Sequence, residues 1–547
     1  MDLDSSGFLA EVIADPENDI PRLIYADWLE EQGSPRGEFI RVQCELSQTN
    51  DLDPRWLDLQ ARSEQLLTQH GKQWAEELGQ DVRKCEYTRG FIETITILAR
   101  TLLKNGDQLL QSFPVRWIRL NYVKGTAEHW HDCATLQHVR YLDLSGLKIP
   151  DADLVAILSS PHLANLKGIK LGGLDMQISE EIIFALSRPR IAGSLEFLEF
   201  HGPEETTNLV MNAFQNSVGL PKLQHLFLSS EVSVDLGRMT TGSLKTLDMN
   251  AYLSVRGAEQ ITRLGIRELN TLRLLSAQET AFRHIAQAGV LESPETVRFE
   301  GIELSYGSAE WVFQGRNLQN CRSLDLKGFR SVCSTEQGSE LMQMISAHAP
   351  FQALRELKLS NLQPGHLALL LRSPFLTKLE SIKIEESSIS AEDFAELVAS
   401  GVHKSLKKLW LDRMCPPSEA LAELKNTIFP NLLHLAIDRR FMYGPSMEGV
   451  EAEIISLLQS GSLPALQNLT ISGINLTEKT LLAIAECANL GQLRQFHFEE
   501  NHGSNEAMFA VLESSLLPRL RLFSLKGCRG LRRSAKLAAK YGTRLRY

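Results

Sequence analysis

The chain has 547 residues, of which 43% are hydrophobic and 23% are charged, a balance typical of a folded globular protein. Its formal charge of −10, from 57 basic and 67 acidic residues, argues against general nucleic-acid binding, which needs a basic surface. No apolar run reaches the roughly 18 residues of a membrane-spanning helix. The first residues lack the basic and apolar segments of a secretory signal, so we expect a cytoplasmic protein with no membrane partner.

The sequence contains no recognisable catalytic or metal-binding motif. Its eight cysteines are dispersed and form no C-x-x-C pair, which argues against a disulfide framework and a zinc ribbon. The motifs G-x-S-x-G, H-E-x-x-H and G-x-x-x-x-G-K-S/T, which carry hydrolase, zinc-protease and nucleotide chemistry, do not occur. We therefore expect no enzyme, no cofactor and no metal site, and we nominate no catalytic residue.

The N-terminal region is expected to be helical. In residues 1–46, apolar residues recur at helical spacing near 8–13, 23–29 and 39–46, with proline breaks between them. These stretches predict a small helical domain. Residues 47–114 are expected to form a helical linker and an N-terminal cap that leads to the first strand.

Two strings in this region carry a resemblance: Asp19-Ile-Pro-Arg-Leu-Ile-Tyr-Ala-Asp-Trp-Leu-Glu-Glu-Gln-Gly-Ser-Pro-Arg-Gly-Glu-Phe-Ile-Arg-Val-Gln43 and Arg89-Gly-Phe-Ile-Glu93. Together they resemble the repeat-companion domain, a bacterial family that sits in front of sequence repeats. The resemblance implies a bacterial, intracellular repeat protein and brings no established activity with it. Two interpretations stay open: a docking module, and a cap that shields the open core of the first repeat.

A repeated core fills the rest of the chain. The pattern L-x-x-L-x-L starts at Val139 and recurs fifteen times up to Leu520, with a period of about 27 residues that lies inside the leucine-rich repeat range. Each core predicts a short strand with alternating apolar residues. The intervening segments predict helices, and Ser390 and Thr477 are expected to cap two of them. One strand and one helix cannot bury a core alone, so the repeats must stack.

This pattern resembles the leucine-rich repeat proteins, in their long-repeat, ribonuclease-inhibitor-like class, and covers residues 115–547 with a C-terminal cap. The resemblance implies an α/β solenoid shaped as a horseshoe, with a parallel sheet on the inner face and helices outside. The asparagine that usually follows the core is mostly missing, so we expect no continuous asparagine ladder. The stretch from Phe441 to Ser446 is expected to protrude as an inserted loop.

The concave face of the sheet is the candidate binding site. Because a strand has a period of two, the residues on either side of the fourth core position point to this face. The candidate partner-binding residues there are Tyr141, Phe197, His201, His225, Phe227, Arg273, Arg298 and Trp410. Phe197 and Phe227 lie on adjacent repeats, and aromatic residues and arginine are the usual anchors of protein interfaces. The alternatives are apolar residues scattered over a broad sheet and a contact surface on the outer helices.

Charge is unevenly distributed along the chain. The last 22 residues carry eight basic and no acidic residues, whereas residues 1–50 carry eleven acidic and three basic ones. Arg532, Lys536 and Lys540 share one face of a predicted helix. Three interpretations stay open for this basic C-terminal face: a nucleic-acid or acidic-partner contact, head-to-tail association between copies, and a capping helix with a solvated face.

The function that the sequence favours is a non-catalytic scaffold that binds a partner protein, of unknown identity, through the concave face. The alternative is a regulatory adaptor whose N-terminal helices dock one partner while the repeats select a target. A third hypothesis is a nucleic-acid or acidic-partner contact through the basic C-terminal face.

Overall fold

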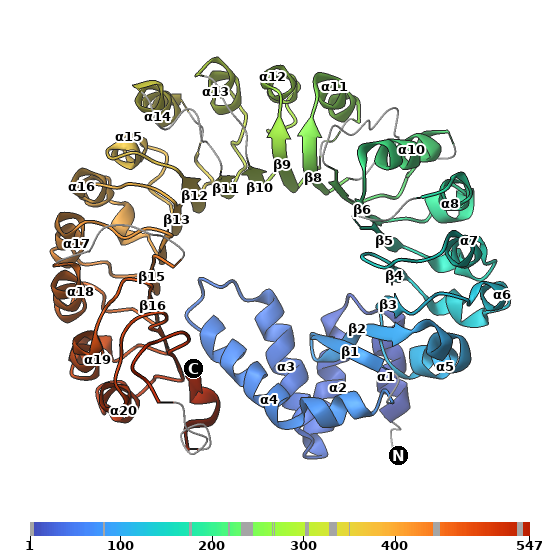
Figure 1. Cartoon of the computed structure of the whole chain (residues 1–547), viewed down its shortest axis with the longest axis horizontal. Coiled ribbons are helices and arrows are strands. Elements are labelled where there is room, and N and C mark those ends of the chain that lie inside the picture. The colour runs from blue at the N-terminus through green and yellow to red at the C-terminus, as the bar shows by residue number, and fades with distance from the viewer. Residues whose placement is uncertain are drawn as a thin grey trace. The chain divides into compact units, whose positions relative to one another are not determined.

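The computed structural model describes residues 5–79, 82–173, 178–216, 219–230, 244–264, 266, 268–300, 306–327, 336–348, 351–440, 449–532 and 540–546. The chain forms two compact units, Met1–Thr271 and Leu272–Tyr547. In each of them, strands alternate with helices along the chain (Figure 1).

The first unit begins with four helices, α1 (Ser5–Ala14), α2 (Asp19–Glu31), α3 (Pro35–Gln48) and α4 (Trp56–Glu76). The side chain of Asn18 caps α2 by accepting a hydrogen bond from the Ile20 N–H at 3.0 Å, and Ser34 caps α3 ahead of Pro35. Tyr25 and Phe91 belong to the buried apolar cluster that joins these helices to the sheet. The predicted helical N-terminal region is therefore confirmed.

A β-hairpin follows, inside a segment that we expected to be helical. Strands β1 (Val82–Thr88) and β2 (Phe91–Leu98) pair antiparallel. Their turn places Arg89 and Gly90 at φ 47° and 85°, the positive values that a tight two-residue hairpin turn requires. A Cβ on Gly90 would also lie 2.4 Å from the Ile40 Cα. Since β2 pairs parallel with the next strand, the parallel sheet begins near residue 91 and not near 115.

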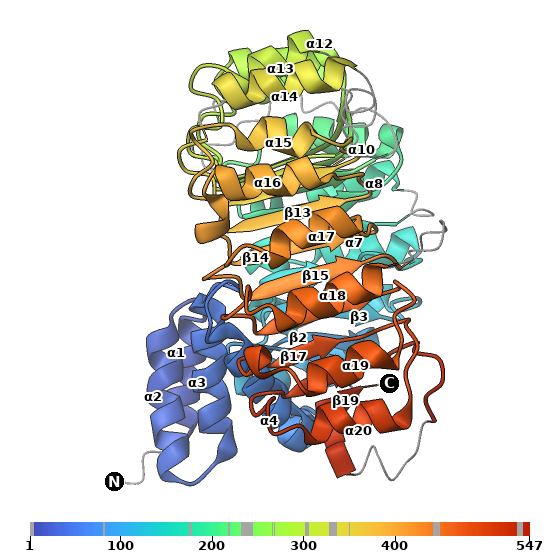
Figure 2. The same cartoon turned by 90° about the vertical axis from the view of Figure 1, so that its left-hand side faces the viewer.

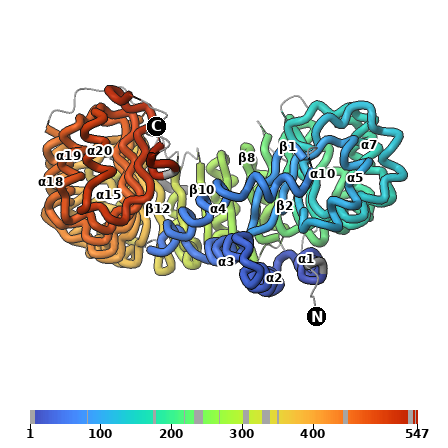
Figure 3. The backbone as a smooth tube through the Cα atoms, turned by 90° about the horizontal axis from the view of Figure 1, so that it is seen from below, coloured from blue at the N-terminus to red at the C-terminus, as the bar shows by residue number. Residues whose placement is uncertain are grey.

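The rest of the first unit alternates strand and helix. Its remaining elements are α5 (Ala99–Ser112), β3 (Trp117–Asn121), α6 (Ala127–Trp130), η1 (Ala134–His138), β4 (Tyr141–Asp143), α7 (Asp151–Ser159), η2 (Leu163–Asn165), β5 (Gly168–Gly172), α8 (Glu180–Leu186), α9 (Pro189–Ala192), β6 (Phe197–His201), α10 (Glu204–Gln215), β7 (His225–Ser229), β8 (Thr246–Leu253) and α11 (Val255–Arg263). Strands β2 to β8 are parallel and paired in chain order. Helices α1 to α3 project from one flank of this unit, beyond the hairpin (Figure 3).

The second unit repeats the same alternation after β9 (Thr271–Ala277). Its elements are α12 (Glu279–Gln287), β10 (Thr296–Phe299), α13 (Tyr306–Phe313), β11 (Ser323–Leu326), α14 (Glu336–His348), β12 (Glu356–Ser360), α15 (His366–Leu371), β13 (Ser381–Glu385), α16 (Ala391–Ala399), η3 (Val402–Lys404), β14 (Lys408–Asp412), α17 (Ser418–Lys425), β15 (His434–Asp438), α18 (Val450–Gln459), β16 (Asn468–Ser472), α19 (Glu478–Ala485), η4 (Ala488–Leu490), β17 (Gln495–His497), α20 (Asn505–Glu513), β18 (Leu522–Ser524), η5 (Gly542–Arg544) and β19 (Leu545–Arg546). Strands β10 to β19 are parallel. Helices α15 to α20 stack along one side of them (Figure 2).

The repeat prediction is confirmed. The fifteen predicted cores coincide with the strands from β4 to β18. In β6, Leu198 and Phe200 are fully buried under the helices, whereas Phe197 and Glu199 are half-buried on the opposite side, as the period of two requires. Each unit is thus an α/β leucine-rich repeat stack with a parallel sheet on one face and helices on the other.

The predicted helix caps are also present. Ser390 and Asp393 form a reciprocal capping box at the start of α16, and the Thr477 side chain accepts from the Lys479 N–H at the start of α19. The predicted inserted loop at 441–446 lies outside the described residues.

Neighbouring repeats are joined by buried polar side chains. The Asp153 carboxylate, at the start of α7, accepts hydrogen bonds from the backbone N–H groups of Gly125 and Thr126 in the preceding repeat, at 3.0 and 2.7 Å. Asp393 and Asn501 hold the preceding turns of other repeats in the same way. A carboxylate at a helix start therefore does at some repeats what an asparagine ladder does in other classes, because a turn's buried N–H groups must find an acceptor.

Candidate functional site

Aromatic side chains from neighbouring strands meet on the open sheet face of the first unit. Trp117, Tyr141, Gly168, Phe197 and His225 lie opposite one another in the register of β3 to β7. The Trp117 and Tyr141 rings stack with their centroids 4.9 Å apart. The Trp117 and Phe197 rings meet edge to face, with their centroids 5.1 Å apart. Phe197 also lies 5.2 Å from Phe227, which follows His225 by two residues on β7. We call Trp117, Tyr141, Phe197 and Phe227 the aromatic row.

The glycine in the middle allows the rings to close over β5. A Cβ at Gly168 would lie 2.4 Å from the Tyr141 ring and 3.0 Å from the Phe197 Cβ. Any other residue would therefore push these side chains apart. Because Gly168 leaves this space open, Trp117 can reach Phe197 from three strands away.

Charged groups border the aromatic row on the side where the strands end. The Lys170 ammonium lies over the Trp117 ring at 5.1 Å and over the Phe197 ring at 5.5 Å, and it pairs with Glu199 at 2.8 Å. The hydrogen bond from His201 to Glu199, also 2.8 Å, and the contact with Lys170 lower the pKa of Glu199 to about 2 in spite of burial. Lys170 and Glu199 are therefore already paired with each other.

His225 has a different environment on the neighbouring strand. Its imidazole lies 3.1 Å from the Thr246 hydroxyl. Burial, together with the nearby Lys245 ammonium, lowers the pKa of His225 below its ordinary value. A neutral ring extends the aromatic row without adding a charge.

The structure gathers only part of the predicted site. Tyr141, Phe197, His225 and Phe227 lie together in the first unit, with His201 beside them. Arg273, Arg298 and Trp410 belong to the second unit, where each is engaged by a neighbour within that unit. Arg273 pairs with Glu300 at 2.8 Å and Arg298 with Asp325 at 3.0 Å. The ammonium groups of Lys383 and Lys408 lie 4.9 and 5.4 Å from the centroid of the Trp410 ring.

The sheet face of the second unit is built from paired charges. Lys383 contacts Glu385 at 2.6 Å and Asp412 at 3.1 Å. Arg440 contacts Asp438 at 2.6 Å and Glu499 at 2.8 Å. We call the following set the charge lattice: Lys327, Lys383, Glu385, Asp412, Arg413, Asp438, Arg440 and Glu499.

The sequence analysis missed two residues of this surface, Trp117 in the aromatic row and Gly168 between its rings. Trp117 occupies the same place in Val115-Arg-Trp-Ile-Arg-Leu120 as Tyr141 occupies in the next repeat, so the core pattern itself could have found it. Gly168 offers no such signal, because its role depends on the side chains of the strands on both sides.

The basic C-terminal face is only partly described. Lys540 pairs with Glu513 at 2.8 Å, and the Tyr541 hydroxyl donates to the same carboxylate. The Arg532 backbone N–H donates to the Asn505 side chain. Lys536 lies outside the described residues, so a common face of Arg532, Lys536 and Lys540 stays a prediction.

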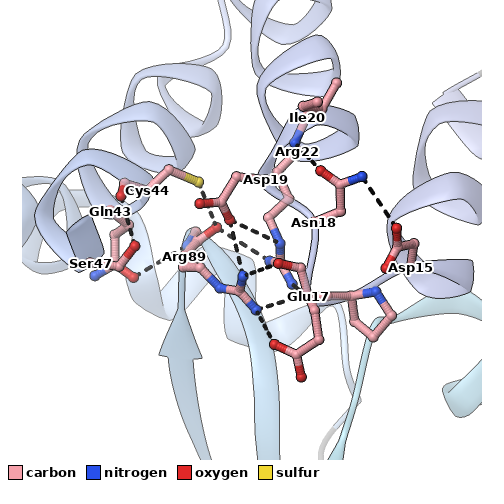
Figure 4. A network of polar contacts seen from close by, with 12 residues as sticks. Asp15, Glu17, Asn18, Asp19, Ile20, Arg22, Gln43, Cys44, Ser47 and Arg89 are labelled. Carbon is pink, nitrogen blue, oxygen red and sulfur yellow. Dashed lines mark hydrogen bonds and ion pairs between the residues drawn. The ribbon is translucent and has the colours of Figure 1, made fainter.

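The two strings that resemble the repeat-companion domain contact each other (Figure 4). The Arg22 guanidinium, which is fully buried, donates to Glu93 at 2.6 Å and to the Pro16 carbonyl at 2.7 Å. Arg89, at the hairpin turn, pairs with Asp19 at 3.0 Å. These hydrogen bonds and ion pairs therefore connect the N-terminal helices to the hairpin and to the first parallel strand, β2.

Within the described ranges, no group of three His, Cys, Asp or Glu side chains could hold a metal ion. Over the same ranges, no helix is both long and apolar enough to cross a bilayer.

No protein-family model and no curated protein matches the sequence. Among solved structures, an internalin from Listeria monocytogenes is similar at 14% identity, over 77% of this chain and 92% of that chain, with a TM-score of 0.29. A structure of the Toll–Spätzle complex from Drosophila is similar at 13% identity, over 80% of this chain and 55% of that chain, with a TM-score of 0.32. Similarity this low carries no information about what this chain binds.

Proposed function

We propose that this chain is a non-catalytic scaffold that binds a partner protein through the aromatic row of the first unit. The observation that carries this proposal is the contact of four aromatic side chains, from strands β3, β4, β6 and β7, on the face opposite the helices. Large aromatic side chains dominate the energetics of protein interfaces.

The packing of these rings favours binding. Each ring is half-buried against a neighbouring ring, so its rotamer is already restricted in the free protein. A side chain that is ordered before association loses less entropy when a partner covers it, and that loss otherwise opposes affinity. The binding mechanism is therefore pre-organised surface complementarity without covalent chemistry.

The proposal is tested by partner capture from the lysate of the source organism with three baits: the unmodified chain, Phe197→Glu/Phe227→Glu and Phe184→Glu/Leu209→Glu. The last pair lies on helices α8 and α10 of the same unit, with exposed fractions of 66% and 51%, and is the matched control. We expect a partner that the unmodified chain and the helix variant retain and that the aromatic variant loses. A partner lost only with the helix variant would move the site to the outer helices.

The adaptor hypothesis is favoured by one observation on α2. Ile20 and Ile24 lie one helical turn apart and are 64% and 47% exposed, which gives the N-terminal helices an apolar surface of their own. We expect Ile20→Glu/Ile24→Glu, made in the full chain, to release a second partner while the aromatic row keeps the first. If this variant keeps every partner, the N-terminal helices serve only as a cap.

The C-terminal hypothesis and head-to-tail association stay predictions. Arg532→Glu/Lys536→Glu/Lys540→Glu should abolish a contact whose affinity falls steeply with salt, and should also abolish any salt-dependent self-association seen in sedimentation. A bacterial origin and a cytoplasmic location are proposals that rest on composition and on the resemblance of residues 19–43.

A further inference from the structure

A groove of about 540 Å³ runs along the N-terminal ends of the strands in the first unit, beside the turn between α1 and α2. Its lining includes Pro16, Arg116, Arg140, Lys167, Glu196 and Lys222. Five of the residues around it, namely Arg116, His138, Arg140, Lys167 and Lys222, are cationic or can become so. In a chain whose net charge is −10, this is a local concentration of positive charge.

Not all of these cations are available. Arg116 contacts Glu93 at 3.4 Å, and Lys167 pairs with Glu196 at 2.9 Å. Arg140 and Lys222 form no ion pair with any residue that the structure describes, and neither does Lys245, which lies directly before β8. Lys222 and Lys245 are exposed and Arg140 is half-buried. We call Arg140, Lys222 and Lys245 the basic rim.

The basic rim lies directly beside the aromatic row. Arg140 precedes Tyr141 in the chain, and Lys245 precedes Thr246, which pairs with His225 in the sheet register. The groove reaches the aromatic row at Arg116, which lines the groove and whose guanidinium lies 5.4 Å from the centroid of the Tyr141 ring. A ligand that follows this edge of the sheet therefore meets both the cations and the rings. At the strand ends it meets charges that are already paired, such as Lys170 with Glu199.

We propose that the basic rim and the aromatic row together bind an extended acidic segment of the partner protein. Its carboxylates would meet Arg140, Lys222 and Lys245, and its apolar side chains would cover the rings. This inference rests on the proposed function and names the chemistry of the partner. From β4 to β8 the strands cover about 19 Å, which about six residues of extended chain would span.

A single-stranded nucleic acid fits the same surface less well. Its affinity comes from bases that stack on free ring faces. Here Trp117 and Tyr141 stack on each other, and Lys170 lies over both Trp117 and Phe197. Arg140, Lys222 and Lys245, which pair with no described residue, also offer little to a strand that carries a phosphate at every nucleotide, on a protein that is acidic overall.

The test is fluorescence anisotropy of the full chain with labelled short peptides. The probe alternates Glu with Phe or Leu, one comparison peptide has Lys for Glu, and another has Ser for the apolar residues. An oligothymidylate is the nucleic-acid probe. We expect the acidic apolar peptide to bind best, and Arg140→Glu/Lys222→Glu/Lys245→Glu to weaken it by about tenfold or more, which corresponds to about 1.4 kcal/mol.

The matched control is Arg316→Glu/Lys378→Glu/Lys479→Glu, which makes the same charge change at exposed cations of the second unit. Equal weakening by the control would overturn the inference, because the effect would then be one of net charge. Tighter binding of the oligothymidylate, or no binding of the acidic peptide, would overturn it as well.

The same variants separate this inference from the proposed function. If Phe197→Glu/Phe227→Glu abolishes partner capture while the basic-rim variant leaves it unchanged, the aromatic row binds a partner and the acidic-segment inference is wrong. If neither variant affects capture, both proposals are wrong.

Discussion

The sheet faces of the two units share one backbone pattern but differ in their side chains, which are aromatic in the first unit and charged in the second. In the first unit, the opening strand position holds Trp117, Tyr141 and Phe197. In the second unit, the corresponding positions of β11 and β12 hold Ser323 and Glu356, and the positions that follow carry the charge lattice. A partner that covered the lattice would have to desolvate ions that already satisfy one another, which is unfavourable. A partner that covers the aromatic row removes apolar surface from water, which is favourable.

The repeat thus determines the direction of the side chains but not their chemical type. The fold alone therefore cannot indicate where a partner binds. The variants below test whether the two faces differ in the way that their contacts imply, from the largest expected effect to the smallest.

Removing the central carboxylate of the charge lattice should have the largest effect. Glu385 is buried and contacts Lys327, Lys383 and Arg413 at 3.4, 2.6 and 3.2 Å. Glu385→Ala leaves these cations crowded, and we expect a loss of about 3 kcal/mol in the free energy of unfolding, near the lower end for breaking a buried ion pair. Denaturant unfolding measures it. Glu392→Ala, which removes an exposed pair with Arg372, is the control and should change stability by less than about 0.5 kcal/mol.

Filling the space over β5 should disrupt the aromatic row. Gly168→Leu puts a side chain where the Tyr141 ring lies, and we expect a loss of about 2 kcal/mol together with a change in tryptophan fluorescence as Trp117 loses its contacts. The double variant Gly168→Leu/Tyr141→Ala should recover part of this stability, because it removes the ring that is displaced. No recovery would mean that the strand backbone, and not the ring, resists the new side chain.

Each face carries one carboxylate hydrogen-bonded by a histidine two residues away, and their pH dependence should match. His201 lowers the pKa of Glu199, and His497 that of Glu499, each from 4.5 to about 2. A lowered folded-state pKa gives stability that is present above about pH 4.5 and is lost as the pH falls toward 2. Glu199→Gln and Glu499→Gln should each be about 1 kcal/mol less stable than the unmodified chain at pH 6.

That difference should shrink as the pH approaches 2, where the native carboxylates also become protonated. Denaturant unfolding at pH 6 and pH 3 measures it. A difference that stays constant with pH would show that the glutamine variants lose packing and not charge.

The smallest effect is expected from the cation above the rings. Lys170→Met removes the ammonium from Trp117 and Phe197 and keeps an apolar chain over them, so we expect a loss of about 0.5 kcal/mol. Tryptophan fluorescence should shift only slightly. A loss above about 2 kcal/mol would indicate that the ion pair with Glu199, and not the contact with the rings, holds this part of the sheet face.

Much of the fold follows from local pattern. The fifteen cores predict their strands because each buries the same alternating residues. The hairpin was missed although β2 alternates like a half-exposed strand, with buried Ile95 and Ile97 between half-buried Thr94, Thr96 and Leu98. The sequence placed Phe197 and Phe227 on adjacent repeats, but the contact of Trp117 with Phe197 depends on an empty position between them. A contact that depends on the absence of a side chain at Gly168 cannot be recognised from the pattern of core residues.

The separation of the site into two groups also lay beyond the sequence. Arg273, Arg298 and Trp410 satisfy the same directional rule as Tyr141, yet carboxylates and lysines of neighbouring strands engage them. Whether a charged side chain is free depends on the residue one repeat away, some 27 positions distant, and not on its own core.

The contact between Arg22 and Glu93 has a consequence for the order in which the chain folds during synthesis. Helices α2 and α3 are complete before the ribosome releases the hairpin that they bind, and the hairpin emerges before β4 and every later core. Domains form from the N-terminal side as translation proceeds. The first parallel strand thus emerges after the helices that it contacts, and each later strand emerges after the strand with which it pairs. Until the next repeat is synthesised, the last strand therefore presents an edge without its partner.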